Sequence, residues 1–256
     1  MGEYVKGKIY RGVLTGLNEA FVIDKSTRDR LIAEDPKSAE IIKPFLAGRD
    51  IKRYQQPVSD KYLIFTRRGI IIDNYPAILK HLEQFKTQLE PKPKDHTGPW
   101  TGRKPGTYKW YEIQDAVDYY EKFEKEKLVY PNICKQPEFT IVDKGYFTNQ
   151  KCFIITHYTK SLLAFLNSNL CFFLFKSILP KLRGDFYEPS YIYFKDFPVI
   201  ETENEQLVSV VNEILITKKQ DPSADTTVLE HEIDRLVYGL YGLTEEEIGI
   251  VENAFK

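Results

Sequence analysis

Basic and aromatic residues gather in two stretches of the 256-residue chain, and a shorter basic loop follows later. Residues 49–68 and residues 92–111 each carry a net charge of +4, and the second stretch contains both tryptophans. Arginine reads guanine edges, lysine neutralises phosphate, and flat rings stack on bases, so this combination suits contact with nucleic acid. The candidate contact residues are Arg49, Lys52, Arg53, Arg67, Arg68, Trp100, Arg103, Lys104, Lys109, Lys181 and Arg183.

Local sequence suggests which of these candidates read bases. Arg103 lies between Gly102 and a Lys-Pro-Gly turn, so we expect it at a loop tip as the base reader, with Arg49 as the second choice. Trp100 lies in the same long loop and is expected to be exposed, whereas Trp110 and Tyr111 are expected in the core. We expect one concave surface formed by Arg49, Lys52, Arg67, Trp100, Arg103, Lys104 and Arg183. The alternative stays open that the basic side chains are merely solvated and that the aromatic side chains belong to the hydrophobic core.

Charge is distributed unevenly along the chain. Residues 196–256 hold 14 acids and 4 bases, whereas residues 1–195 hold 32 bases and 23 acids. This asymmetry predicts a body that faces a polyanion and an acidic tail with another task. We expect the tail to form helices that pack on the body or a partner, away from DNA.

Several catalytic patterns are missing from the sequence. It has no phosphate loop, no dinucleotide-binding glycine motif, no nucleophile elbow and no paired-cysteine or HExxH metal motif, so no metal site is predicted. Acid-x-Lys triplets begin at Asp35, Asp50 and Glu90 and leave open a nuclease centre. A protein-interaction scaffold that docks a partner through its acidic tail is a further alternative.

Hydrophobic periodicity predicts a mixed body followed by helices. Strands are expected at residues 5–13, 20–23, 62–66, 128–130, 139–142, 151–156 and 191–194. Helices are expected at residues 27–33, 37–43, 76–89, 115–125, 161–177 and 228–241, with capping boxes at Thr202 and Thr244. Residues 90–107 and 180–189 are expected to be irregular. The predicted fold class is α/β (α+β), with a mixed-sheet body over residues 1–200 and a helical segment over residues 201–256.

The cysteines and the chain start bear on location. Cys134, Cys152 and Cys171 are odd in number and widely spaced, which favours a reducing, cytoplasmic setting over a disulfide framework. The first ten residues lack the apolar run of a signal peptide. Residues 161–179 are apolar but interrupted by polar residues, so a buried helix is expected there and not a membrane span.

The order of seven segments is similar to one known family. The segments are residues 12–23, 42–54, 110–112, 128–133, 163–168, 195–199 and 234–243. Together they resemble the TaqI-like C-terminal specificity domain of N6-adenine DNA methyltransferases, a group that includes fused type II restriction–modification enzymes. The resemblance covers nearly the whole chain and rests on the succession of motifs, such as Gly48-Arg49-Asp50-Ile51 and Phe197-Pro198.

The resemblance implies target recognition on double-stranded DNA. In such enzymes a separate catalytic domain binds S-adenosylmethionine and flips an adenine, while this domain reads the sequence. The catalytic F-x-G-x-G and N-P-P-Y motifs are absent from these 256 residues. We therefore expect a non-catalytic specificity part, with no cofactor of its own, that works with a methyltransferase catalytic domain in cis or as a subunit. Asp50 of the family motif is expected to pair locally.

Overall fold

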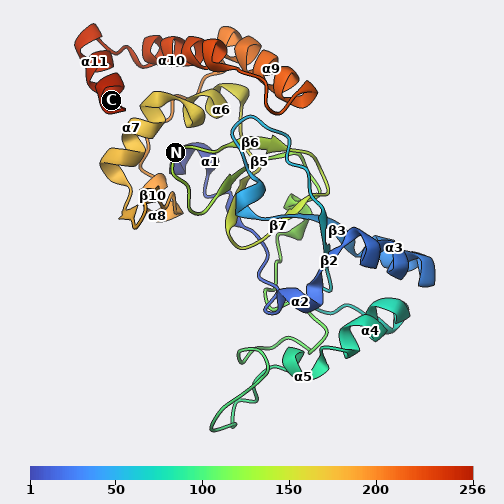
Figure 1. Ribbon diagram of the computed structural model, residues 1–256. Helices are drawn as coiled ribbons and strands as arrows, with labels where there is room; N and C mark the ends of the chain where they lie inside the picture. The colour runs from blue at the N-terminus through green and yellow to red at the C-terminus, as the bar shows by residue number, and fades with distance from the viewer. Residues whose placement is uncertain (256) are drawn as a thin grey trace.

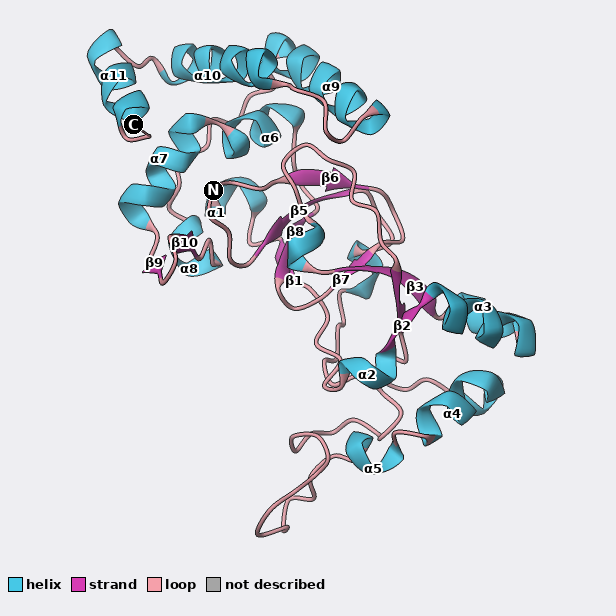
Figure 2. Cartoon of the chain, viewed as in Figure 1, coloured by secondary structure: helices cyan, strands magenta, loops and turns pink. Residues whose placement is uncertain are grey.

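A four-stranded antiparallel sheet separates two hydrophobic cores in the computed structural model, which describes residues 1–255 (Figures 1 and 2). Its strands, in spatial order, are β1 (Ile9–Arg11), β8 (Cys152–Ile155), β5 (Lys127–Pro131) and β6 (Thr140–Val142). Side chains alternate across a strand, so Leu128 and Tyr130 enter one core while Val129 enters the other. The predicted strands at 128–130, 139–142 and 151–156 are confirmed.

The second core lies around another four-stranded sheet. Its strands are β2 (Val22–Asp24), β4 (Lys61–Ile64), β3 (Ile42–Leu46) and β7 (Phe147–Thr148), and only the β3–β7 pair is parallel. Four helices contribute to this core or flank it: α2 (Asn18–Phe21), α3 (Lys25–Glu34), α4 (Pro76–Glu83) and α5 (Lys86–Leu89). Three 3₁₀ turns complete this part: η1 (Pro36–Glu40), η3 (Ile72–Asn74) and η4 (Tyr120–Lys122).

The first core is built mainly from helices. They include α1 (Gly2–Val5), α6 (Lys160–Asn167), α7 (Asn169–Ile178) and α8 (Tyr191–Phe194), beside the hairpin β9 (Lys181–Leu182) and β10 (Phe186–Tyr187). Every residue from Ser161 to Asn167 is buried, which confirms the expected buried helix. The single helix predicted at 161–177 is two helices bent by 58°, because Ser168 ends α6 and its Oγ accepts the Cys171 N–H to begin α7. Within residues 1–255 no single helix is long and apolar enough to span a membrane; only this bent pair meets the criteria of length and composition.

Three helices form the acidic C-terminal segment. They are α9 (Glu205–Gln220), α10 (Thr227–Tyr241) and α11 (Glu245–Asn253), and they pack on α6 and α7 at the top of Figure 1. Their apolar stripes, which include Leu207, Val211 and Val237, are buried in the first core as predicted. The capping box at Thr244 and Glu247 is confirmed, whereas α9 is capped by Asn204 and not by Thr202.

Other predicted elements also differ in the structure: the strand at 20–23 begins only at Val22, after α2, and the helix at 76–89 is divided into α4 and α5. Residues 115–125 form only one 3₁₀ turn, since Val117 has a φ of +50° and Asp115 accepts the Leu14 N–H and pairs with Arg11. The strand predicted at 191–194 is a helical turn, which places Phe194 and Phe197 in contact in the first core. The helix predicted at 37–43 shortens to η1 because residues from Ile42 onward pair with β4.

A polar junction joins the helical segment to the body. The Arg53 guanidinium lies 2.9 Å from the Glu230 carboxylate and also donates to the Asn167 carbonyl. Next to it, the Asp234 carboxylate accepts the Asn169 N–H at 2.7 Å. Burial raises the Asp234 pKa to about 6, although this hydrogen bond and Arg53 favour the charged form. The junction therefore holds a carboxylate whose ionisation opposes folding above that pH.

Replacing Asp234 with asparagine is expected to stabilise the fold at pH 7.5 by about 1–3 kcal/mol. Because the Asp234 pKa is higher in the folded state, its carboxyl does not destabilise the fold below its unfolded-state pKa, and it destabilises the fold increasingly as the pH rises to about 6. The asparagine amide cannot ionise, and its oxygen still accepts the Asn169 N–H. Urea unfolding between pH 3.5 and 8 should show the difference between parent and variant growing with pH. Exposed Glu213→Gln on α9 is the control; a less stable Asp234→Asn variant at pH 7.5 contradicts the prediction.

Candidate nucleic-acid interface

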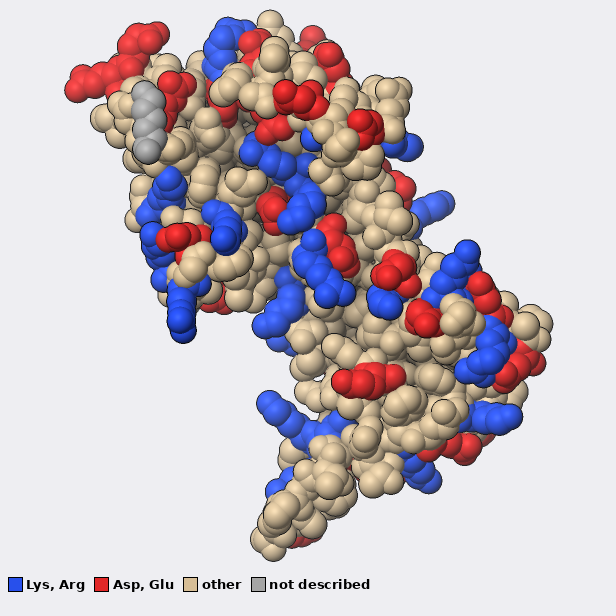
Figure 3. Space-filling view, viewed as in Figure 1, with Lys and Arg blue, Asp and Glu red and all other residues tan. Residues whose placement is uncertain are grey.

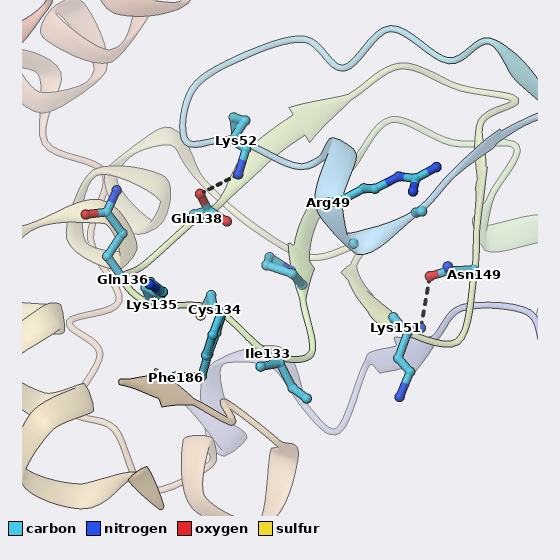
Figure 4. A pocket seen from close by; sticks show the side chains of 13 residues that line it. Arg49, Lys52, Ile133, Cys134, Lys135, Gln136, Glu138, Asn149, Lys151 and Phe186 are labelled. Atoms are coloured by element: carbon cyan, nitrogen blue, oxygen red, sulfur yellow. Dashed lines mark hydrogen bonds and ion pairs between the residues drawn. The ribbon is translucent and has the colours of Figure 1, made fainter. Parts of the chain in front are cut away.

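A hollow of about 780 Å³ lies where both sheets end (Figure 4). Its walls are the 3₁₀ turn η2 (Gly48–Asp50), the loop between β5 and β6, the turn between β7 and β8, and Phe186 of β10. Four basic side chains and one carboxylate line it: Arg49, Lys52, Lys135, Lys151 and Glu138. The hollow thus gathers positive charge from segments far apart in the sequence.

Arg49 is held at the rim by the turn that carries it. The Asp50 carboxylate accepts the Ala47 N–H at 2.7 Å and closes η2, which confirms the expected local pairing of Asp50. Gly48 permits a close approach, since a Cβ there would lie 3.1 Å from the Lys151 carbonyl oxygen. The Arg49 side chain projects outward and is 82% exposed, with its Nε 3.7 Å from Asp50. Its guanidinium is therefore available to a ligand.

The three lysines of the hollow differ in their surroundings. Lys52 pairs with Glu138 at 3.0 Å, and the Lys135 ammonium lies 5.2 Å from the centre of the Phe186 ring. Lys151 follows a tight turn in which Asn149 Oδ1 accepts the Lys151 N–H at 3.0 Å. Figure 4 shows the Arg49 side chain extending from η2 and the Lys151 side chain extending from the turn before β8. Lys135 and Lys151 have no carboxylate within ion-pair distance among residues 1–255.

The hollow continues into two neighbours, and the three together are called the basic groove. One neighbour shares Lys135 and adds Lys176 and Lys181; the other shares Arg49 and Asn149 and adds Lys61. Seven basic and four acidic residues line the basic groove, a net charge of +3. In Figure 3 blue side chains follow the concave side of the molecule, between the lobe with β9–β10 and the loop beyond α5. Such a line of positive charge suits an elongated anionic ligand.

The predicted contact residues are spread over several places. Arg49, Lys52 and Lys181 line the basic groove, and Arg183 is exposed in the turn between β9 and β10. Arg67 borders a separate hollow, where it lies 4.9 Å from the centre of the Tyr120 ring. The single hollow therefore contains only two of the seven residues expected to share one surface.

Two arginines that were predicted to contact nucleic acid instead make hydrogen bonds and ion pairs within the protein. Arg53 belongs to the junction with the helical segment. Arg68 donates to the carbonyl oxygens of Ile113 and Gln114 at 2.8 and 2.7 Å and lies 3.7 Å from Glu112. Both side chains are half-buried, and these contacts hold their guanidinium groups against the protein and away from the basic groove.

The expected position of Arg103 at a loop tip is wrong. Its side chain is 4% exposed and lies 4.3 Å from the centre of the Tyr108 ring. The guanidinium donates at 2.7–3.2 Å to five carbonyl oxygens, those of Leu89, Thr15, Glu112, Lys109 and Trp110. Arg103 thus ties the loop to the body and cannot reach a base from this position.

The remaining predicted residues lie on or next to the protruding loop. Trp100 is half-buried and not exposed, since its indole N–H donates to the Glu90 carbonyl at 3.2 Å. Lys104 is exposed, and the exposed Lys109 ammonium lies 5.5 Å from the centre of the Tyr111 ring. Trp110 and Tyr111 pack against the second core as expected.

In the acid-x-Lys triplets, the carboxylates of Asp35 and Asp50 and the backbone of Glu90 take part in local structure. Asp35 accepts the Lys37 N–H at 3.2 Å, Asp50 closes η2, and the Glu90 carbonyl accepts the Arg103 N–H at 2.9 Å. Within residues 1–255, no group of three His, Cys, Asp or Glu side chains is placed to hold a metal ion.

Sequence reasoning missed four residues of the basic groove: Lys61, Lys135, Lys151 and Lys176. Lys135, Lys151 and Lys176 are single bases among neutral or mixed neighbours, so counting charge in a window did not single them out. Lys61 lies within the basic stretch of residues 49–68 but was not among the candidates chosen from it. The usable signal was positional: Lys135 and Lys151 follow and precede the strands β5 and β8, whose ends meet in the antiparallel pair. A correct prediction that β5 pairs with β8 would have placed the two lysines close together.

One comparison with known proteins identifies a family, and another finds a similar fold. Residues 43–199 match the TaqI-like C-terminal specificity domain, which is more than half of the chain. The fold is similar to that of the type IIL restriction-modification enzyme MmeI, solved in complex with DNA, with a TM-score of 0.64 and 13% sequence identity over 96% of this chain and 36% of that chain.

A second solved structure, the type IIG restriction endonuclease BpuSI, is matched with a TM-score of 0.47 and 12% identity over 92% of this chain and 31% of that chain. The chain spans about a third of the length of these two proteins. Among curated proteins the comparison finds no match. On the family match over residues 43–199, the chain belongs to the TaqI-like C-terminal specificity domain family.

Proposed function

We propose that this chain binds double-stranded DNA through the basic groove and reads a target sequence for a restriction–modification enzyme. The observation that carries the proposal is the net charge of +3 along the basic groove, in a chain of the specificity-domain family. Duplex DNA carries one negative charge per about 1.7 Å, so a groove with a net positive charge gains affinity for it by releasing counterions.

The division of labour follows from where the charges lie. Residues 1–200 carry the basic groove, whereas residues 201–256 hold 13 acids against 4 bases and cover α6 and α7. Acidic helices repel a duplex, so the proposal places DNA on the side of η2 and β9–β10 and leaves the helical segment for protein contacts. The exposed Arg183 and Lys104 would reach phosphates beyond the two ends of the basic groove.

The proposal also includes the reaction that recognition serves. The target would be methylated at an adenine N6 by a catalytic domain that binds S-adenosylmethionine, joined to this chain in cis or as a subunit. This chain itself would contribute no catalytic residue, since it lacks the F-x-G-x-G and N-P-P-Y motifs. Its role would be to fix the register of the duplex by phosphate contacts and to read base edges.

Photo-cross-linking to a duplex that carries 5-bromodeoxyuridine tests the placement. The expected cross-linked peptides come from residues 127–152 and 181–187, which surround the basic groove. Irradiation at about 1 M salt is the control, because the Debye length there is about 3 Å and groove contacts are screened. Cross-links confined to α9, α10 and α11 would overturn the proposed surface.

A further inference from the structure

The loop between β5 and β6 presents three exposed side chains to the basic groove. Ile133 is 41% exposed, and Lys135 and Gln136 are exposed two and three residues later. All three line the hollow of about 780 Å³, and Figure 4 shows them along one loop across from Lys52 and Arg49. An apolar group, a cation and an amide therefore share one wall of the proposed DNA site.

The backbone of this loop is fixed at several points. The Asn132 N–H donates to the Lys151 carbonyl at 2.7 Å, and Cys134 and Tyr187 exchange backbone hydrogen bonds at 3.1 and 2.7 Å. At the other end, the buried Asn167 side chain accepts the Phe139 N–H at 3.0 Å and donates to the Phe139 carbonyl at 2.9 Å. A loop held in this way presents its side chains without a large ordering cost on binding.

The uncharged polar side chains of the hollow are not equivalent. Asn149 is used within the protein, because its Oδ1 accepts the Lys151 N–H. The Cys134 thiol is buried. The Gln136 amide has no hydrogen-bond partner among residues 1–255, so both its donor and its acceptor are free for a ligand. A glutamine amide is matched to the N6 donor and N7 acceptor that adenine shows in the major groove.

We propose that Gln136 is a specificity-determining residue that reads an adenine in the major groove of the bound duplex, with Ile133 packing on a thymine methyl group beside it. The inference rests on the proposed function, because it requires the duplex to lie in the basic groove. Lys135, between the two, contacts a phosphate and contributes to binding of every sequence. The loop thus combines one sequence-independent contact with two contacts to an A·T-containing step.

Selection from a randomised duplex pool with the full chain tests the proposal. The parent is expected to enrich a motif with one adenine position that Gln136→Ala loses while the rest of the motif persists. Replacing that adenine by 7-deaza-adenine, which lacks N7, should weaken parent binding about 5- to 150-fold, which corresponds to about 1–3 kcal/mol, and leave Gln136→Ala binding unchanged. Gln206→Ala, at an exposed position of α9, is the matched control and should keep the full motif.

The outcomes separate this inference from the proposed function. A parent that enriches a motif which Gln136→Ala retains in full overturns the inference and leaves duplex recognition standing. A parent that enriches no duplex motif overturns both. Lys135→Ala should lower affinity for cognate and unrelated duplexes by the same factor, and a changed motif in that variant would contradict the assignment of roles within the loop.

Discussion

Replacing Arg103 with alanine is expected to lower the free energy of unfolding by about 3–5 kcal/mol. The guanidinium donates to five backbone carbonyls, and an alanine would leave these acceptors buried without a donor, each costing about 1–3 kcal/mol unless water enters. Burial lowers the Arg103 pKa to about 10, so the group is still charged at neutral pH. Urea unfolding monitored by tryptophan fluorescence measures the loss.

A conservative variant at Arg103 and a variant of a surface arginine serve as controls for this result. Arg103→Lys keeps the charge but cannot donate in five directions, so it should fall between alanine and the parent. Arg235→Ala on α10 removes an exposed arginine that pairs with Glu232, and should change stability by less than about 1 kcal/mol. An Arg103→Ala variant as stable as Arg235→Ala would contradict the structural role.

Arg103 shows why a basic, glycine-rich loop is ambiguous in sequence. Glycine and proline around an arginine suit an exposed tip that approaches DNA, and they equally suit a loop whose carbonyls converge on a buried guanidinium. The second arrangement requires acceptors from Thr15 and Leu89, which lie 88 and 14 residues away. Such distant partners are set by tertiary structure and leave no local pattern.

Removing three groove cations together is expected to lower duplex affinity about 100- to 500-fold at about 0.1 M salt. Arg49, Lys135 and Lys151 are the groove cations chosen, because Lys52 is paired with Glu138 and Lys181 with Asp185. Changing all three to glutamine keeps polar side chains while removing phosphate contacts that each contribute about 0.9 to the salt slope. Fluorescence anisotropy with a labelled duplex measures the affinity.

The matched control removes three positive charges outside the basic groove. Lys37, Lys80 and Lys219 are exposed on η1, α4 and α9, outside the hollows that form the basic groove. Changing these three to glutamine alters the net charge equally and should shift affinity by no more than about threefold, since distant exposed charges are largely screened. Equal losses in both triple variants would mean that only net charge matters.

Elements with strong local signals could be predicted from the sequence. Strand β5 and the buried helix α6 have apolar runs, and the α11 capping box has both of its residues at the right spacing. Residues 115–125 could not be assigned correctly, since their helical pattern is overridden by polar contacts from Arg11 and Leu14. Only part of the positive charge of the hollow could be predicted from the sequence. Arg49 and Lys52 lie in a basic stretch, whereas Lys135 and Lys151 come close together only because β5 pairs with β8.

The dependence of duplex affinity on salt tests the role of the basic groove most directly. With the full chain and a random duplex, a plot of log Kobs against log salt should be linear with a slope of about −3 to −6, and the Arg49, Lys135 and Lys151 triple variant should lose about 3 of that slope. The Lys37, Lys80 and Lys219 variant should keep the parent's slope. A parent slope near zero, or a groove variant with the same slope as the parent, would contradict DNA binding through this surface.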